Sequence, residues 1–538
     1  MKDTLLITGL IDNKTVKNKY KYENIKSNYV SLNEIFKIYN INKNKIYWRQ
    51  NLKGPSSNKK VLFFEYPGET LWPKKKESTL TEVLLKTILK SNKYTYDFLD
   101  INEIVNESDS AKIILSKNFK SISLSTTHIH DIDTLLKILN IIKKYNKATI
   151  ILGGRYASDN FKNLKKYFNS LIDYIIKYDG EIGYVHLLKC LGKGEKKECL
   201  KLVPNLIWIS DNKLAENSFK TFDINKNMLP DWNLAEYGGD YIFYEAARGC
   251  NFRCRFCTYW LTEKKLNFKS TEKIFNEWST YYKMGIKNIK IYDSTFAYPP
   301  ERLIKLCRML IKHNIKLKWS CYSRSTDIIS ESMAELMAKA GCELVSIGIE
   351  SGSDIILKNM SKLATVRNHE DAIKYLEKAG IIAQCGFVIG FPGETLKTIE
   401  ESYKFIINNN LRLVNIQPFT IRSLKMLILN PKFKKQFQIK LKKIDQDHYD
   451  WTHETMNLKK ATKVSLDLKN KILNANNSSV SFRYYLNKKN LFDIDPYFFY
   501  DANALMQKFY IKKSKLIKTK LYKKVITELF NNYFIYEN

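Results

Sequence analysis

Short apolar runs alternate with amphipathic segments along residues 61–200, and this alternation is the strongest pattern in the first half of the chain. Apolar runs are typical of buried strands, whereas apolar residues spaced three and four apart predict helices. In residues 79–92, for example, Leu80, Val83, Leu84 and Ile88 share one helix face. Strands that alternate with helices predict an open, doubly wound parallel sheet. The predicted strands are 61–64, 94–101, 121–126, 148–152 and 171–176, with helices at 79–92 and 131–145.

The alternation restarts at Tyr241 and continues to Pro418. Six apolar runs are separated by five helical patterns, two of which end at Gly341 and Gly380, as helices commonly end at glycine. Six such units predict a partial (β/α)6 TIM-type barrel, in which functional residues lie at the carboxyl ends of the strands. The predicted strands are 241–247, 288–293, 316–324, 344–350, 381–389 and 412–418.

The rest of the chain is assigned by composition. Residues 1–57 are rich in Lys and Asn, and we interpret them as an N-terminal extension that ends in a Gly-Pro-Ser linker. Residues 201–240 predict a hairpin and a connector. The predicted domains are therefore a Rossmann-like sheet domain over 58–200, a barrel over 241–425 and a mostly helical C-terminal domain over 426–538.

Charge changes this picture little. The 538 residues carry a formal net charge of +34, which would suit a nucleic-acid partner. The excess is mostly Lys spread along the chain, with short runs such as Lys74–Lys76, so we interpret it as compositional bias and do not expect nucleic-acid binding. No stretch is long and apolar enough for a membrane span, and no signal peptide is visible, which predicts a cytoplasmic protein without a membrane partner.

Three cysteines lie in the segment directly after the first predicted barrel strand. Cys250, Cys254 and Cys257 have the spacing C-x3-C-x2-C. Three thiolates from one loop can bind three irons of a [4Fe-4S] cluster and leave the fourth iron open to another ligand. A zinc site remains an alternative, although only one C-x2-C pair is present, and inert thiols are another. The neighbouring Arg248 and the other loop arginines suit anion or cofactor contacts, or simply the structure of the loop.

The other six cysteines are scattered through apolar patterns, and we interpret them as core residues rather than as disulfide partners. They are Cys190, Cys199, Cys307, Cys321, Cys342 and Cys385.

The cysteine spacing, with aromatic Phe256 directly before the third Cys, resembles the radical S-adenosylmethionine (SAM) superfamily. The resemblance implies that SAM binds the open iron and is reductively cleaved to a 5′-deoxyadenosyl radical. It also implies SAM contacts at several strand ends of the barrel. Asp293-Ser294-Thr295 would meet the amino group, Ser323 and Arg324 the carboxylate, Glu350 and Ser351 the ribose, and Phe256 and Gly390 the adenine side.

Residues 61–200 resemble the cobalamin-binding domain that precedes the barrel in one radical SAM class. Tyr66-Pro67 and Gly153–Ser158 carry this resemblance, and Asp450–Met456, which includes His453, resembles a C-terminal segment of the same class. An Asp-x-His-x-x-Gly segment is missing, and His128 and His130 lack that context, so no axial ligand is assigned. A sheet that binds nothing is the alternative. The implied cobalamin contacts are Ser125, Thr126, Gly153, Gly154, Asp179, Gly180 and Glu181.

Together these resemblances imply a cobalamin-dependent radical SAM methyltransferase that acts on an unactivated carbon of a small molecule or peptide. Its electron donor would resemble flavodoxin or ferredoxin. The alternatives are a radical SAM oxidoreductase, cyclase or rearrangement enzyme without methyl transfer, and, more distantly, a basic nucleic-acid-binding protein with a structural metal. A tRNA methylthiotransferase fits less well, because three further N-terminal cysteines are missing.

Overall fold

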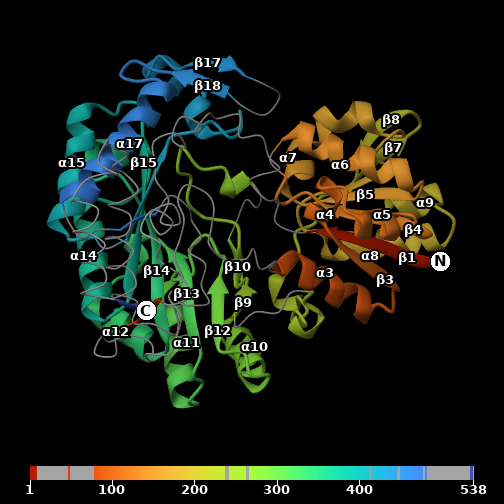
Figure 1. Cartoon of the computed structure of the whole chain (residues 1–538), viewed down its shortest axis with the longest axis horizontal. Helices are drawn as coiled ribbons and strands as arrows, with labels where there is room; N and C mark the ends of the chain where they lie inside the picture. The colour runs from red at the N-terminus through yellow and green to blue at the C-terminus, as the bar shows by residue number, and fades with distance from the viewer. Residues whose placement is uncertain are drawn as a thin grey trace.

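The computed structural model describes residues 1–8, 46–48, 78–129, 131–236, 241–261, 266–411, 413–444, 449–475, 479–481 and 534–536. Two α/β units, each built on a seven-stranded sheet, lie side by side (Figure 1). The unit coloured red to yellow comes from the N-terminal part of the chain, and the unit coloured green to blue comes from the C-terminal part. The predicted class, a mixed α/β protein with parallel sheets, is confirmed.

The first sheet has the strand order β3-β1-β4-β5-β6-β7-β8. Its first five strands pair in parallel, whereas β7 and β8 are antiparallel and form the predicted hairpin. Four predicted strands are present with shifted ends, and the fifth, at 61–64, lies outside the described residues. The strands are β1 (Lys2–Thr8), β3 (Tyr96–Asp100), β4 (Phe119–Ser125), β5 (Thr149–Gly153), β6 (Tyr174–Ile176), β7 (Leu206–Ser210) and β8 (Lys213–Glu216).

Strand β1 corrects the assignment of residues 1–57 as an extension. It lies between β3 and β4, inside the sheet. Leu5, Leu6 and Ile7 are fully buried, because a strand inside a parallel sheet is covered on both faces and reads as a continuous apolar run rather than an alternating one. The run is short and is followed by a long Lys- and Asn-rich stretch, which hid the signal.

Helices cover both faces of this sheet. Their side chains and those of the strands form two separate hydrophobic clusters, one on each face. Two of these helices were predicted from the sequence, namely α3 (Leu80–Ser91) and α6 (Ile132–Tyr145). The sequence did not predict α7 (Arg155–Leu164), which follows β5, or α8 (Gly180–Gly192), which follows β6. It also did not predict three short helices, α4 (Ile101–Val105), α5 (Asp109–Leu115) and α9 (Lys197–Lys201).

The second sheet has the order β19-β16-β15-β14-β13-β12-β9, and every pair is parallel. The six predicted barrel strands occur in the predicted order, and β19 (Ser479–Ser481) is a seventh that the sequence did not predict. Gly341 before β14 has φ +91°, and a Cβ there would come 2.0 Å from the Leu317 carbonyl oxygen, so the site requires glycine. The strands are β9 (Tyr241–Tyr244), β12 (Asn288–Ile291), β13 (Lys318–Ser323), β14 (Cys342–Glu350), β15 (Ile382–Ile389) and β16 (Leu413–Pro418).

The helices between these strands pack around one large core. They are α10 (Thr271–Lys283), α11 (Pro300–Lys312), α12 (Glu331–Lys339), α13 (Asp354–Asn359), α14 (Val366–Lys378) and α15 (Leu396–Asn408).

The C-terminal region is less helical than predicted over its described part. Helix α17 (Leu458–Ala475) is present, but α16 (Pro431–Gln436) is short and leads into an antiparallel hairpin of β17 (Lys440–Lys443) and β18 (Tyr449–Thr452). The hairpin lies at the upper end of the barrel in Figure 1. A small sheet pairs β2 (Ile46–Trp48) with β20 (Phe534–Tyr536). Among the described residues, no helix has the length and apolar character needed to cross a membrane.

A disulfide corrects the prediction for two cysteines. Cys190 near the end of α8 and Cys199 in α9 are bonded, with Cα atoms 5.7 Å apart. The two short helices meet at a tight turn, and this tertiary arrangement brings together residues that the sequence pattern had placed separately in a core. The other four predicted core cysteines (Cys307, Cys321, Cys342 and Cys385) are free and buried.

Candidate functional site

The three candidate ligand cysteines lie on a loop that starts from a small hairpin. Strand β10 (Ala247–Arg248) pairs with β11 (Asn267–Phe268), and the loop runs between them. All three thiols are free; Cys254 is buried, and Cys250 and Cys257 are half-buried. Burial raises the pKa of Cys257, and the charges of Cys254 and Cys250 raise it further. Cys254 and Cys250 therefore lie within electrostatic range of Cys257.

This donor set fits an iron–sulfur cluster. Three thiolates that repel one another need a cationic group between them, and a cluster provides irons for thiolate ligands. In the part of the chain that the structure describes, no three His, Cys, Asp or Glu side chains converge on one point as a single metal ion requires. An iron–sulfur cluster does not require this convergence, because its three thiolates bind three different irons.

Residues at the carboxyl end of β12 form hydrogen bonds with the start of this loop. Asp293 is buried, and one of its carboxylate oxygens accepts the backbone N–H of Ala246 at 2.8 Å. Burial raises the pKa of Asp293 to about 7. The hydroxyl of Ser294 donates to the Gly249 carbonyl at 2.7 Å, and that of Thr295 donates to Asp327. Asp293 and Ser294 thus hold the start of the loop, whereas Thr295 is bonded to Asp327, and the contact of all three with SAM stays a prediction.

Arg324 places a cation beside the cysteines. Its Nη1 lies 3.6 Å from the Cys254 sulfur, its guanidinium lies 3.7 Å from the centre of the Phe252 ring, and its Nη2 donates to the Lys362 carbonyl. The hydroxyl of neighbouring Ser323 donates to the Arg324 carbonyl at 3.2 Å. The guanidinium therefore donates to the sulfur of a candidate cluster ligand, and its contact with the carboxylate of SAM stays a prediction.

The ends of β14 and β15 carry the remaining predicted SAM contacts. Glu350 has φ +68°, and its Oε1 forms an ion pair with Nζ of Lys362 at 3.0 Å. Ser351 is fully buried, and its Oγ accepts the backbone N–H of Ser353. Phe256 packs edge-on against Phe391, with ring centres 6.4 Å apart. These residues lie at the same end of the barrel as the cysteine loop, which is the arrangement that parallel strand ends produce.

The C-terminal segment holds the turn after β15. Gly390 has φ +89°, and a Cβ there would lie 2.4 Å from the Cβ of Ala461. The Gly390 N–H donates to the carboxylate of Glu394, whose pKa burial raises to about 8. The Gly390 carbonyl lies 3.1 Å from Nε2 of His453, and the His453 ring stacks on Trp451. Because burial lowers the pKa of His453, this ring is a neutral donor that fixes the turn.

A cavity of about 380 Å³ opens at the carboxyl ends of β4, β5 and β6. Six of the seven predicted cobalamin contacts line it, namely Ser125, Gly153, Gly154, Asp179, Gly180 and Glu181. Thr126 does not; it is fully buried, and its hydroxyl donates to the Gly153 carbonyl at 2.6 Å. A Cβ on Gly153 would meet no described atom within 4 Å, so the glycine leaves open space in the cavity wall. His128 is not among the lining residues, and His130 lies outside the described residues.

The opposite wall of the cavity comes from the barrel side. Glu245, Arg248, Gly249 and Tyr259 line it, and they flank the three cysteines in the sequence. The sequence did not predict this second wall, because it depends on how the two sheets pack.

Arg248 joins the two walls. Its guanidinium donates to Asp179 at 3.0 Å, to Glu181 and to Glu245 at 2.8 Å. Burial lowers the pKa of this arginine, but Glu245 and Glu181 outweigh that effect and raise it well above its ordinary value. A second arginine, Arg155 of α7, donates to the hydroxyl of Thr258 at 2.7 Å. The cysteine loop is thus attached to the first sheet on both sides of the cysteines.

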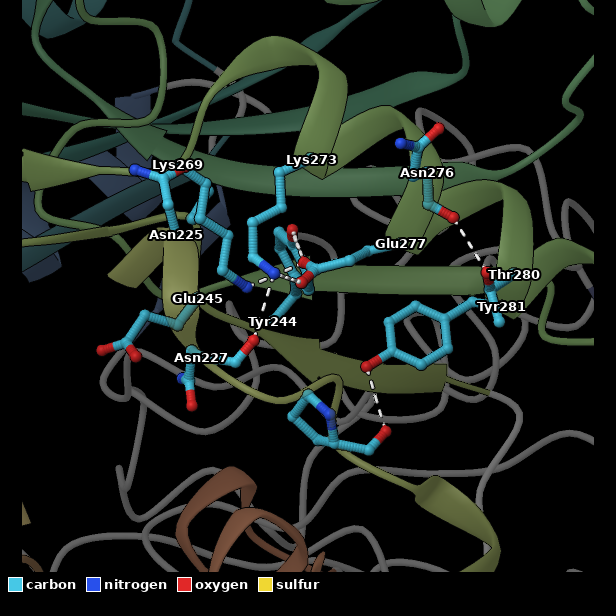
Figure 2. A network of polar contacts seen from close by, with 12 residues as sticks. Asn225, Asn227, Tyr244, Glu245, Lys269, Lys273, Asn276, Glu277, Thr280 and Tyr281 are labelled. Carbon is cyan, nitrogen blue, oxygen red and sulfur yellow. Dashed lines mark hydrogen bonds and ion pairs between the residues drawn. The ribbon is translucent and has the colours of Figure 1, made fainter. Parts of the chain in front are cut away.

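A buried ionic network anchors the same hairpin to helix α10 (Figure 2). Lys269 donates to Glu277 at 2.8 Å, and the hydroxyl of Tyr244 donates to the same carboxylate. The backbone N–H of Lys269 donates to the Ala246 carbonyl at 2.8 Å, so the network connects directly to the strand before the loop. The sequence offered no distinct signal for these residues, because the surrounding stretch contains other charged and polar residues, such as Glu272 and Lys273.

The sequence model of the radical SAM superfamily matches residues 244–406, which include the three cysteines and four of the strand ends described above. Residues 244–406 are a radical SAM domain. This domain implies a [4Fe-4S] cluster and SAM as its cofactors.

Curated relatives of this chain match over part of their length. An uncharacterized methyltransferase of Pyrococcus horikoshii is 29% identical over 310 residues, which cover 55% of this chain and 66% of the relative. An anaerobic magnesium-protoporphyrin IX monomethyl ester cyclase of Rubrivivax gelatinosus is 26% identical, and the match covers 53% of this chain and 53% of the relative. The chain therefore spans about half to two thirds of the length of these relatives.

A solved structure of similar fold is the radical SAM methyltransferase TsrM of Kitasatospora setae, with cobalamin and a [4Fe-4S] cluster bound. The match has a TM-score of 0.57 at 15% identity, and it covers 69% of this chain and 75% of that one. At this identity the likeness shows the shared fold.

Proposed function

We propose that the protein is a cobalamin-dependent radical SAM methyltransferase that acts on an unactivated carbon of a small molecule or peptide. The observation that carries this proposal is the shared cavity, which has one wall at the strand ends of the Rossmann-like sheet and the other at the cysteine loop. A cofactor in that cavity would face the cluster directly. The solved methyltransferase of similar fold, which binds both cobalamin and a cluster, supports this interpretation.

Under this proposal, Cys250, Cys254 and Cys257 hold the cluster, and the residues at the ends of β12 to β15 surround SAM. The bound groups supply a 5′-deoxyadenosyl radical and a methyl carrier. The chain itself orients them and shields them from water. Gly153 leaves room for the cofactor, Arg248 fixes the spacing of the two walls, and Arg324 donates to the sulfur of Cys254.

The cavity wall also fits a ligand rich in N–H donors. Asp179 and Glu181 are nearly buried, with side chains 4% and 10% exposed. Arg248 occupies one oxygen of each, and among the described residues the second oxygen of Glu181 has no hydrogen-bond partner. A buried carboxylate oxygen without a hydrogen-bond donor costs free energy of folding. The amide side chains of a corrin could supply such a donor. A polar ligand is therefore favoured over an empty cavity.

The cluster assignment is tested by SAM cleavage. Anaerobically reconstituted protein with dithionite should release 5′-deoxyadenosine, and changing any one of the three cysteines to Ala should abolish the release. Cys385→Ala, which alters a buried free thiol on β15, is the matched control and should retain it. Full turnover in a ligand-cysteine variant would contradict the assignment.

The cobalamin assignment is tested by filling the cavity. Gly153→Leu points a side chain into the open space of the wall, so bound cobalamin per chain should fall from about one to near zero while the iron content is unchanged. Gly192→Leu is the matched control, because that glycine at the exposed end of α8 also has no described atom within 4 Å of its would-be Cβ. If both variants and the parent bind no cobalamin, cyclisation or oxidation without methyl transfer becomes the better proposal, and the similar cyclase supports that alternative.

A further inference from the structure

A strongly basic surface lies next to the cysteine loop. Residues 421–444 contain eight Lys or Arg and no Asp or Glu, and all eight basic side chains are exposed. We call these eight residues the basic segment. They are Arg422, Lys425, Lys432, Lys434, Lys435, Lys440, Lys442 and Lys443.

The basic segment is one compact piece of structure. The backbone N–H of Ile439 donates to the Lys434 carbonyl, so α16 leads directly into β17. Leu441 packs on the barrel core, and because side chains alternate along a strand, its neighbours Lys440 and Lys442 point away from that core. Asp450 of β18 stands opposite Lys442, and Asp445 and Asp447 follow the segment in the sequence. The lysines of α16 thus lie ten or more positions before these acids in the chain.

The basic segment touches the loop that holds the candidate cluster cysteines. The guanidinium of Arg255, which lies between Cys254 and Cys257, stacks 3.8 Å from the centre of the Phe433 ring in α16. The backbone N–H of Ile428 also donates to the Arg255 carbonyl at 3.2 Å. Arg253 of the same loop is exposed. Positive charge therefore extends from α16 onto the surface of the loop itself.

We propose that the basic segment is the docking surface for an acidic one-electron carrier protein that reduces the cluster. This inference rests on the proposed function, because a cluster that cleaves SAM reductively must receive one electron for each cleavage. The carrier is oxidised by one electron and the cluster is reduced by one, with no bond made or broken at the surface. A basic patch steers an acidic partner to the loop and raises its association rate by roughly 10- to 1,000-fold, an effect that salt weakens.

Charge reversal on α16 tests this proposal. The variant Lys432→Glu, Lys434→Glu, Lys435→Glu changes exposed residues only. The matched control is Lys283→Glu, Lys287→Glu, Lys316→Glu, which carries the same change in charge. These control lysines are exposed and lie at or before the starts of β12 and β13, at the opposite end of the barrel from the hairpin (Figure 1). Lys434, Lys435 and Lys283 all lie in last turns of helices, so the two variants also lose similar helix-end interactions.

The measurement is 5′-deoxyadenosine release with two reductants, dithionite and a small acidic flavodoxin kept reduced by its reductase and NADPH. With dithionite all three proteins should turn over equally. With flavodoxin, the α16 variant should show at least a tenfold higher apparent KM for the carrier, whereas the control should match the parent. The difference should shrink as salt rises from 50 to 500 mM.

Equal KM values for the α16 variant and the parent would overturn the proposal. Failure of the parent with dithionite would instead refute the proposed function. In that case, direct binding of oxidised flavodoxin to the three proteins decides the docking question by itself, with loss of binding expected only in the α16 variant. Tighter binding of a 20-nucleotide single-stranded RNA than of flavodoxin, lost in the α16 variant alone, would overturn the proposal in favour of a nucleic-acid surface.

Discussion

Replacing Glu277 by Gln tests whether the buried network of Figure 2 holds the cysteine loop in place. The side chains of Lys269 and Glu277 are 3% and 7% exposed, and Lys269 Nζ lies 2.8 Å from Glu277 Oε2. Gln keeps the shape of Glu but removes its charge, so the ammonium of Lys269 stays buried without its main counter-ion. Removing one partner of a buried ion pair costs about 3–5 kcal/mol.

The same substitution has a predictable pH dependence. Burial lowers the pKa of Lys269, and Glu277 opposes that effect. In Glu277→Gln the pKa of Lys269 falls further below its unfolded value, so between these two values the unfolded state binds more protons than the folded state. Stability of the variant therefore rises with pH across that window, and the loss relative to the parent is larger at pH 7 than at pH 9.

The assay is anaerobic thermal unfolding together with iron per chain after reconstitution. A loss of about 3 kcal/mol lowers the Tm of a domain of this size by roughly 6–12 °C. Because Lys269 is hydrogen-bonded to Ala246, the variant should also bind less iron. Glu272→Gln, in the exposed Glu272–Lys305 pair at the start of the same helix, is the control and should leave both unchanged. An unchanged Tm in Glu277→Gln, or an equal fall in Glu272→Gln, would refute the reasoning.

The remaining predictions concern other parts of the fold. The pKa of Glu394 is raised to about 8, so the folded state holds a proton that the unfolded state releases near pH 4.5. The free energy of unfolding should therefore fall by a few kcal/mol, on the order of 3–5, as the pH rises between these two values. Glu394→Gln should remove most of that fall in unfolding curves recorded from pH 5 to 9. Gly390→Ala should lower Tm well beyond Gly380→Ala, because both glycines have positive φ but only Gly390 would bring a Cβ within 2.4 Å of Ala461. Under non-reducing conditions Cys199→Ser should cost up to about 3 kcal/mol through the lost loop constraint, whereas with a strong thiol reductant it should match the parent.

The barrel was predictable because each of its six strands is an apolar run bounded by a helix with a clear apolar face. Strand β1 was not, because Leu5, Leu6 and Ile7 form a single short run whose partners, β3 and β4, lie about a hundred residues away. Similarly, β19 pairs with β16 across more than sixty residues. Pairing between distant segments leaves no local pattern to read.

The candidate site divides in the same way. The cysteine triad and the strand-end glycines are local motifs. The structure places the glycines on one wall of a cavity whose other wall is formed by residues that flank the cysteines. The contacts of Arg324 with Cys254 and Phe252 were not predicted, because they depend on how the loop folds over the end of β13. The role of Arg248 depends on three carboxylates, two of which come from the other sheet, so no spacing in the sequence could have indicated it.

The central claim is that a cofactor in the cavity faces the cluster held by the cysteine loop. Electron paramagnetic resonance of protein carrying cob(II)alamin and a reduced cluster tests it most directly. The account predicts that the cob(II)alamin signal relaxes faster in the parent than in Cys250→Ala, which lacks the cluster but keeps the cavity. Identical relaxation in the two proteins, with cobalamin bound to both and the cluster reduced in the parent, would contradict the claim.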